Sequence, residues 1–215
     1  MNRYGALFTC LASRAVHLEV ADSLETDSFI NALRRFICTR GSAREIRCYR
    51  GTNFIGAEAE LKKAIEEMDD QEIKAELLKE NIGWIKNPAC ASIFGGVWER
   101  QIRSIRSVVN GLIREHGSRL VEESLRTFLC EAEYTINSRP LTVETLNDPL
   151  FAPPLSPSML LTGKTKLVLP PPGEFKRDDL YHRKRWSRTQ HLAQEFWSRW
   201  SKEYLQQLQV RDKWI

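Results

Sequence analysis

The stretch that decides the fold is Tyr4 to Val20, YGALFTCLASRAVHLEV, in a chain of 215 residues. A compact apolar run over Leu7–Leu11 is followed by residues that can turn, Ala12–Arg14, and Ala15 to Val20 then alternates between apolar and polar side chains. Alternation with a period of two is typical of a strand with one buried face. The stretch therefore predicts a β-hairpin with one fully buried strand.

Helices and strands alternate after the hairpin, and a hairpin ahead of the first helix favours a mixed sheet. The first helix can be capped by Thr26 or Asp27, carries apolar residues with a period of 3.6, and ends at Gly41. The elements expected after it are a strand over 45–49, a charged helical stretch over 57–81, a strand over 83–86, and helices over about 97–115, 122–137 and 184–209. The predicted fold class is α/β.

The composition limits the classes to which the protein can belong. Hydrophobic residues make up 42% of the chain, which is enough for a core and excludes wholesale disorder or a fibrous protein. No apolar run approaches the roughly 18 residues of a transmembrane helix, and residues 1–5 do not resemble a signal peptide, so no membrane partner is expected. The five cysteines lack metal-ligand or disulfide-framework spacing, which favours a reducing, intracellular compartment.

The C-terminal part differs from the rest in proline content and charge. Eight of the nine prolines lie between residues 140 and 172, which predicts an extended linker. Residues 176–215 carry 10 Lys and Arg against 5 Asp and Glu, whereas residues 1–175 carry 22 against 23. This basic segment indicates an anionic partner or a linking helix.

The last predicted helix carries an aromatic stripe made of Trp186, Trp197, Trp200 and Tyr204. Such a stripe can stack on nucleic-acid bases, but on a helix it is more often a packing face, and packing is the interpretation we favour. The basic residues between Arg183 and Arg188 can still contact phosphates.

Three segments, taken in order, resemble one known family. They are Tyr4–Val20, IRCYRGTNF over 46–54, and FGGVWE over 94–99. Over residues 3–172 the chain resembles the integrase catalytic core of Pao/BEL-type LTR retrotransposons. The resemblance implies a ribonuclease-H-like mixed sheet flanked by helices, with the first strand missing because the chain begins at the hairpin. It implies a core domain over 3–140, a proline-rich linker over 141–182 and, over 183–215, the truncated helical start of the domain of unknown function that follows such cores.

The resemblance also implies a site in which three acidic residues hold two Mg²⁺ or Mn²⁺ ions for DNA strand transfer. The first acid belongs to the strand that is expected to be missing. The second acid, an aspartate in the family, corresponds to Tyr49, and the third corresponds to Glu99 at the expected start of a helix. Glu99 is therefore the single remaining metal ligand that the resemblance implies.

A tyrosine at the second position changes the expected activity. A phenol is neutral near pH 7 and cannot replace a carboxylate that bridges two metal ions. Glu45 would lie roughly 13 Å from Tyr49 along a strand, and Glu19 lies on the hairpin, so neither is an obvious substitute. We expect an inactive member of an integrase family that binds no metal ion.

Basic residues that follow Glu99 are candidates for contact with nucleic acid. Arg103 and Arg106 lie four and seven positions after Glu99, so the three share one stripe of a helix. The resemblance implies that such positions touch a DNA end and that Asn53 lies near the substrate. From spacing alone, the alternative is a solvated face on which Glu99 is a favourable first-turn acid that pairs with Arg103.

Two histidines have no partners at metal-ligand spacing. We interpret His17 as a packed or surface residue of the hairpin, and His116 as a residue at a helix C-terminus, where a cation is favoured.

The sequence is thus interpreted as a fragment of a retrotransposon-derived integrase whose ancestral role was DNA integration in the nucleus. It is expected to keep only weak DNA binding without sequence preference, and to self-associate. The alternative is a non-enzymatic interaction module from a degenerate element, and translation of a pseudogene is a third interpretation.

Overall fold

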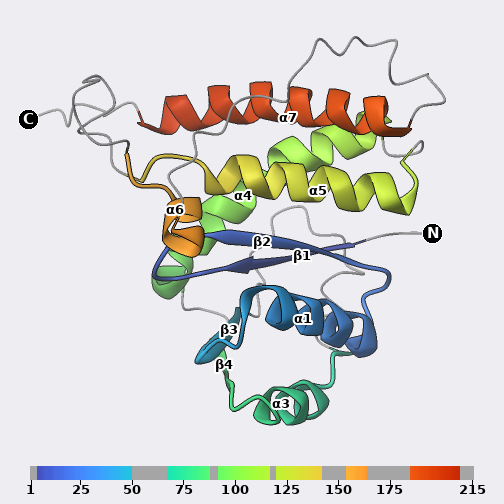
Figure 1. The fold of residues 1–215 in the computed structure, drawn as a ribbon. Helices are drawn as coiled ribbons and strands as arrows, with labels where there is room; N and C mark the ends of the chain where they lie inside the picture. The colour runs from blue at the N-terminus through green and yellow to red at the C-terminus, as the bar shows by residue number, and fades with distance from the viewer. Residues whose placement is uncertain are drawn as a thin grey trace, which may run out of the picture. The chain divides into compact units, whose positions relative to one another are not determined.

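The hairpin predicted at the start of the chain is present in the computed structural model, which describes residues 4–49, 67–87, 92–116, 120–141, 154–163 and 185–208. Strands β1 (Tyr4–Thr9) and β2 (Val16–Ala21) form a two-stranded sheet (Figure 1). The Cys10 N–H donates to the Ala15 carbonyl (2.8 Å), and the Arg14 N–H donates to the Cys10 carbonyl (2.9 Å). Arg14 has a φ of 59°, so the connection turns through a left-handed residue.

Six helices and two further strands make up the rest of the part that the structure describes. They follow in the order α1 (Thr26–Arg40), β3 (Glu45–Tyr49), α3 (Asp70–Leu78), β4 (Gly83–Asn87), α4 (Ser92–His116), α5 (Glu122–Asn137), α6 (Pro157–Thr162) and α7 (Arg185–Leu208). The fold class is α/β, as predicted. The described strands form two two-stranded sheets, β1–β2 and β3–β4, and not the single mixed sheet that was expected. The chain divides into two compact units, residues 1–7 with 18–99 and residues 8–17 with 100–215, so the hairpin contributes to both.

The first unit contains a parallel pair of strands. β3 pairs with β4 in a register that sets Glu45 opposite Gly83 and Tyr49 opposite Asn87. Parallel neighbours require a crossover connection, and α3, which contacts both β4 and α1, lies within it. The arrangement follows from two short strands joined by a segment that contains a helix.

Polar and aromatic contacts hold α1 and α3 in place. The Asp69 side chain caps α3 by accepting from the Gln71 N–H (2.8 Å), and the Asp69 N–H donates to Thr26 Oγ1 (3.0 Å) at the start of α1. Phe29 of α1 makes a tilted ring contact with Trp84 of β4, with centroids 6.3 Å apart. The buried apolar side chains of this unit include Ala32, Leu33, Ile37, Ile73, Leu77 and Ile82.

The second unit is built around α5. One face of α5 is buried along its whole length, and α7 packs against this helix. At its C-terminal end, Asn137 is 4% exposed and pairs with the backbone of Val16 in β2. The Val16 N–H donates to Asn137 Oδ1 (2.7 Å), and Asn137 Nδ2 donates to the Val16 carbonyl (2.7 Å). The side chain therefore acts as a short substitute for a neighbouring strand.

The predicted start of one helix was wrong. Helix α4 begins at Ser92 and not near Val97, so it includes Gly95-Gly96, which precede the predicted start. A glycine inside a helix costs about 1 kcal/mol relative to alanine, and a long amphipathic helix can offset that cost through burial of its apolar face.

The proline-rich segment is not extended throughout. Within the predicted linker the structure describes 154–163, and this part contains α6. Ser156 caps the helix by accepting from the Met159 N–H (3.3 Å), Pro157 occupies the first turn, and Gly163 ends it with a φ of 66°. These are ordinary start and stop signals, and the proline content concealed them. Residues 57–66 of the expected charged helix lie outside the described residues.

The Asn137–Val16 pairing leads to a test of stability. Asn137→Ala should lower the free energy of unfolding by about 2–4 kcal/mol, because it leaves a buried N–H and a buried carbonyl without partners. Asn110→Ala is the matched control, since Asn110 is exposed on α4, and it should change stability by less than about 0.5 kcal/mol. Denaturant unfolding measures both, and equal effects would contradict the structural role of Asn137.

Candidate functional site

Helix α4 has one buried apolar face and one exposed polar face. Its apolar side chains Ile105, Val108, Val109 and Leu112 are all buried. Arg103, Asn110 and Arg114 are exposed, and Arg106 is partly exposed. At 100° per residue these four polar positions fall on the same side of the helix. We call them the α4 polar stripe.

The α4 polar stripe extends further than the sequence analysis predicted. Arg103 and Arg106 were candidates, whereas Asn110 and Arg114 were missed although they continue the same spacing of three or four residues. Along the helix, Arg103 and Arg114 are about 16 Å apart, at 1.5 Å per residue. Among the side chains that the structure describes, none forms an ion pair with Arg103 or Arg114. Two guanidinium groups are therefore presented to solvent on a rigid element, and guanidinium suits phosphate geometrically.

Glu99 was expected in the first turn of its helix, and this expectation was wrong. Because α4 begins at Ser92, Glu99 is the eighth residue of the helix and lies about two turns from its start. The macrodipole effect falls off within the first turn, so it no longer accounts for an acid at this position. Glu99 still precedes Arg103 by one turn, which keeps it in line with the α4 polar stripe.

The other candidate site residues are only partly described. Tyr49 is the last residue of β3 and is paired with Asn87 of β4. Asn53 lies outside the described residues, and the side chains of Tyr49 and Glu99 also lie outside them. The position of Tyr49 at the carboxyl end of a parallel strand is one where ligands commonly bind in α/β sheets.

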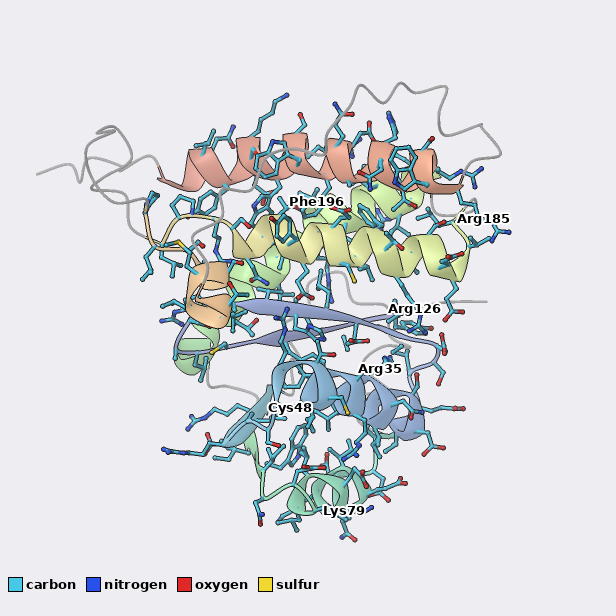
Figure 2. The ribbon with its side chains drawn as sticks, viewed as in Figure 1. Arg35, Cys48, Lys79, Arg126, Arg185 and Phe196 are labelled. Atoms are coloured by element: carbon cyan, nitrogen blue, oxygen red, sulfur yellow. The ribbon has the colours of Figure 1, made fainter. Side chains whose placement is uncertain are left out.

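The two carboxylates considered as substitutes for the second acid are engaged by arginines. Glu45 accepts a hydrogen bond from Arg47 Nε (2.6 Å). Glu19 accepts one from Arg35 Nε (2.7 Å), and Arg35 is labelled on α1 in Figure 2. Within the described ranges, no group of three His, Cys, Asp or Glu side chains could hold a metal ion. The resemblance places Tyr49 where an acid is expected, and a neutral phenol is a poor ligand for Mg²⁺ or Mn²⁺.

The C-terminal part of the aromatic stripe of α7 is a packing face, and the buried Phe196, which the sequence analysis had not included, belongs to it. Phe196 of α7 meets Phe128 of α5 edge to face, with centroids 6.1 Å apart (Figure 2). Trp200 stacks on Phe196, and Tyr204 stacks on Trp200, each pair at 6.1 Å. Trp200 is 6% exposed, whereas Trp186 is 64% exposed. Packing, the favoured interpretation, is therefore confirmed for Trp200, and Trp186 remains accessible.

Polar contacts at the edges of this aromatic stripe join α7 to the rest of its unit. Arg199 donates two hydrogen bonds to the Glu115 carboxylate (3.1 and 2.7 Å) at the end of α4. This neighbouring carboxylate raises the pKa of Arg199. Farther along, Ser107 Oγ donates to Glu203 (3.0 Å). These partners are separated by more than 80 positions in the chain, so no local sequence pattern could have revealed them.

A buried arginine lies at the C-terminal end of α5. Arg139 is 8% exposed, and its guanidinium donates to the carbonyls of Ile136 (2.8 Å) and Arg14. Burial lowers the pKa of Arg139 and raises the pKa of Tyr204, whose hydroxyl donates to the Pro140 carbonyl. The Arg139 guanidinium thus connects α5 to the hairpin turn, and the Tyr204 hydroxyl connects α7 to the residues just after α5.

His17 is a packed residue of the hairpin. Its Nδ1 lies 3.1 Å from Glu133 Oε2 of α5, and its ring makes a tilted contact with Phe8, with centroids 6.2 Å apart. Both members of the pair are largely buried. His116 is the last residue of α4, at the helix end where it was expected.

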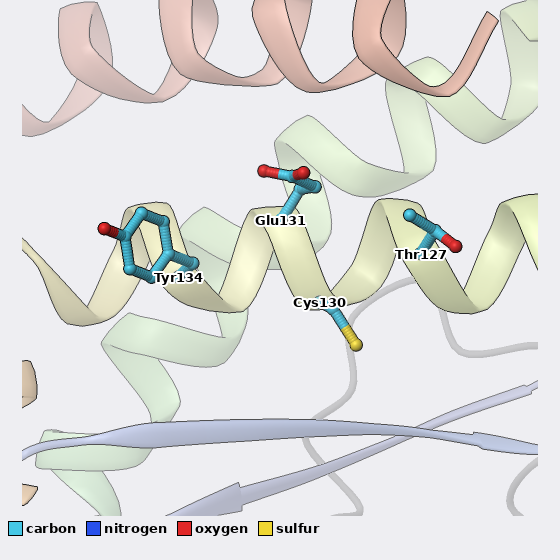
Figure 3. Close-up of a pocket in the computed structure, with 4 residues that line it drawn as sticks. All are labelled: Thr127, Cys130, Glu131 and Tyr134. Carbon is cyan, nitrogen blue, oxygen red and sulfur yellow. The ribbon is translucent and has the colours of Figure 1, made fainter. Parts of the chain in front are cut away.

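A shallow hollow of about 410 Å³ lies along α5 and is lined by Thr127, Cys130, Glu131 and Tyr134 (Figure 3). Figure 3 shows Glu131 pointing toward α7, where its carboxylate accepts a hydrogen bond from Gln190 Nε2 (3.2 Å). The one carboxylate of the hollow is thus already engaged, and no base or nucleophile pair faces it in the part of the chain that is described. Among the described residues, the hollow therefore has no arrangement of catalytic groups.

Comparisons with known proteins add one short match. Residues 184–215 match the Family of unknown function (DUF5641). No curated protein and no solved structure matches the chain. Among the described residues, no helix is both long enough and apolar enough to cross a membrane.

The packing of α7 leads to a second test. Trp200→Ala should lower the free energy of unfolding by about 3–5 kcal/mol, because it opens a cavity in the aromatic stripe. Trp186→Ala is the matched control and should cost less than about 1 kcal/mol, since that side chain is mostly exposed. Thermal or denaturant unfolding compares the two, and a larger loss for Trp186→Ala would contradict the assignment of the packing face.

Proposed function

We propose that the chain is derived from a retrotransposon integrase core of the Pao/BEL type, that it binds nucleic acid, and that it has no strand-transfer activity. The observation that carries the proposal is the α4 polar stripe, in which Arg103 and Arg114 are exposed without a described ion-pair partner. Basic side chains that form no ion pair and lie along a rigid helix attract the phosphate backbone. The contact is expected to be weak and independent of sequence, because contacts to phosphates carry no sequence information.

The order of elements supports the ancestry. The elements follow each other in the order of the resembled segments. A hairpin comes first, then a helix, then two parallel strands with a helix in their crossover. A long helix with an acid and basic residues on one face comes after them. The match over residues 184–215 adds support, because the resemblance implies a domain of unknown function directly after the core. A ribonuclease-H-like sheet is the finer form of the α/β fold that we propose.

The proposed lack of activity rests on the donor set. Strand transfer of the integrase type needs several carboxylates around two divalent metal ions. The resemblance places Tyr49 at the position of one of them, and the two acids considered as substitutes, Glu45 and Glu19, each accept a hydrogen bond from an arginine. A single carboxylate, Glu99, is a poor ligand for Mg²⁺, which releases its water reluctantly.

A second candidate function is a non-enzymatic self-association module. The observation that favours it is the hairpin, in which β1 has a strand partner on one side only within the described residues. Both functions can be present in one chain, because the α4 polar stripe and the edge of β1 are made of different residues.

Nucleic-acid binding can be tested by its dependence on salt. The chain should bind duplex DNA weakly, and its affinity should fall steeply as salt rises, because each neutralised phosphate releases counterions. The double variant Arg103→Glu, Arg106→Glu should weaken binding to every sequence and reduce the slope of log K against log salt by about 2. Fluorescence anisotropy over a salt series measures both quantities.

A matched control is Arg40→Glu, Arg44→Glu, which makes the same change in net charge at two exposed positions outside α4. It should leave the salt slope nearly unchanged. If both double variants reduce the slope equally, binding follows net charge and the α4 polar stripe is not the site. An unchanged slope in the α4 variant would move the contact to the basic residues around Arg185.

The absence of strand transfer gives a separate test. With Mg²⁺ or Mn²⁺ the 215-residue chain should neither nick nor join DNA, and Tyr49→Asp alone should not restore activity, because the first acid of the family is still lacking. A repaired chain that adds the family's first strand to Tyr49→Asp is the minimum expected to act, and Glu99→Gln should abolish its activity. Metal-dependent strand transfer by the unmodified chain, lost in Glu99→Gln, would refute the assignment of Tyr49.

A further inference from the structure

The two edges of the hairpin differ in how their backbone groups are satisfied. The Cys10 N–H donates to the Ala15 carbonyl, and the rings of Phe8 and His17 contact each other across the two strands. Backbone groups in an antiparallel pair alternate between facing the partner and facing away. Val16 and Val20 of β2 therefore point their N–H and carbonyl groups away from β1.

The outer edge of β2 is covered by side chains. Asn137 of α5 pairs with both backbone groups of Val16. At the other end of the strand, Arg35 of α1 donates to the Val20 carbonyl, and Ser28 Oγ accepts from the Asp22 N–H (3.0 Å). Such caps prevent another strand from pairing with that edge.

The outer edge of β1 has no comparable cover. By the same alternation, Gly5, Leu7 and Thr9 point their N–H and carbonyl groups away from β2, and among the described residues no side chain or further strand is bound to them. Gly5 is exposed, and a methyl group placed on it would meet no atom within 4 Å. The strand YGALFT contains no charged residue and no proline, so it lacks the usual protections of an edge strand.

We propose that the β1 edge is a self-association surface, on which β1 of a second copy of this chain pairs in antiparallel fashion across a two-fold axis at Leu7. A row of alternating backbone donors and acceptors is complemented by an extended strand, which selects another backbone as the partner. The result is a continuous four-stranded sheet in the order β2, β1, β1 and β2.

The sequence of β1 is compatible with pairing to itself. With the axis at Leu7, Gly5 faces Thr9 of the other copy, and Ala6 faces Phe8, so small residues lie opposite larger ones. Because the strand is uncharged, no like charges face each other, which would otherwise destabilise the pair. An isologous contact of this kind closes as a dimer and leaves no further β1 edge for growth.

Amide hydrogen exchange of the unmodified 215-residue chain tests this directly. As the protein concentration rises through the monomer–dimer transition, the amides of Gly5, Leu7 and Thr9 should exchange at least about tenfold more slowly, because they become hydrogen-bonded in the dimer. The amides of Ala6 and Phe8 face β2 and should be protected at every concentration. Sedimentation of the same samples gives the oligomeric state.

A charge at the axis is the second measurement. Leu7→Lys places two ammonium groups opposite each other and should raise the dimer dissociation constant by at least about tenfold. Leu78→Lys is the matched control, since Leu78 is 60% exposed on α3, and it should leave the constant unchanged. Circular dichroism confirms that both variants are folded, and the exchange experiment does not depend on either.

Three results would overturn the proposal. The first is a chain that stays monomeric at all soluble concentrations. The second is a dimer in which the Gly5, Leu7 and Thr9 amides exchange as fast as in the monomer, because the interface would then lie elsewhere. The third is protection of these amides in the monomer, which would show that another segment of the same chain covers the edge.

Discussion

The pairing of Asn137 with the backbone of Val16 is the contact on which the second unit depends. The amide side chain supplies one acceptor and one donor, which match the carbonyl and N–H that β2 turns away from β1. The strand would otherwise bury two unsatisfied backbone groups against α5, at a cost of about 1–3 kcal/mol each. One turn earlier on α5, Glu133 pairs with His17, and just beyond α5, Arg139 holds the carbonyl of Arg14. The C-terminal end of α5 is thus bound to the hairpin through polar side chains that are themselves buried.

Local patterns predicted the elements well and the contacts between them poorly. The hairpin, α1 with its end at Gly41, β3 and α5 follow from alternation and helical period, and the structure has them where these signals lie. The predicted cap of α1 was wrong, because Thr26 and Asp27 lie inside the helix and the N-cap residue is Glu25, which makes no side-chain cap hydrogen bond. The start of α4 was missed because two adjacent glycines usually break a helix, and α6 was missed because prolines were read as a linker. In both cases packing or a helix cap outweighed the composition of the segment.

The candidate site was predictable only in part, for a physical reason. Arg103 and Arg106 could be found from helical spacing, and Arg114 could have been found by extending the same spacing by two turns. The pairing of Glu115 with Arg199 joins residues 84 positions apart and leaves no signal in either segment. The same holds for the aromatic stripe. Its spacing shows that Phe196 and Trp200 share a face of α7, but only the structure shows that this face is filled by α5 and is not open to bases.

The two surfaces proposed to bind partners would act through different forces. The α4 polar stripe attracts a partner by charge, which salt screens over about 10 Å at 0.1 M, and it sets few demands on the partner beyond phosphates. The edge of β1 acts through directional backbone hydrogen bonds, which depend on register and depend little on salt. A rise in salt should therefore separate the two activities, releasing nucleic acid before it separates the paired strands. Within the described residues, Arg103 and Arg114 have no ion-pair partner, and the outward backbone groups of β1 have no hydrogen-bond partner. A partner that supplies the missing charge or the missing strand can therefore gain free energy by binding there.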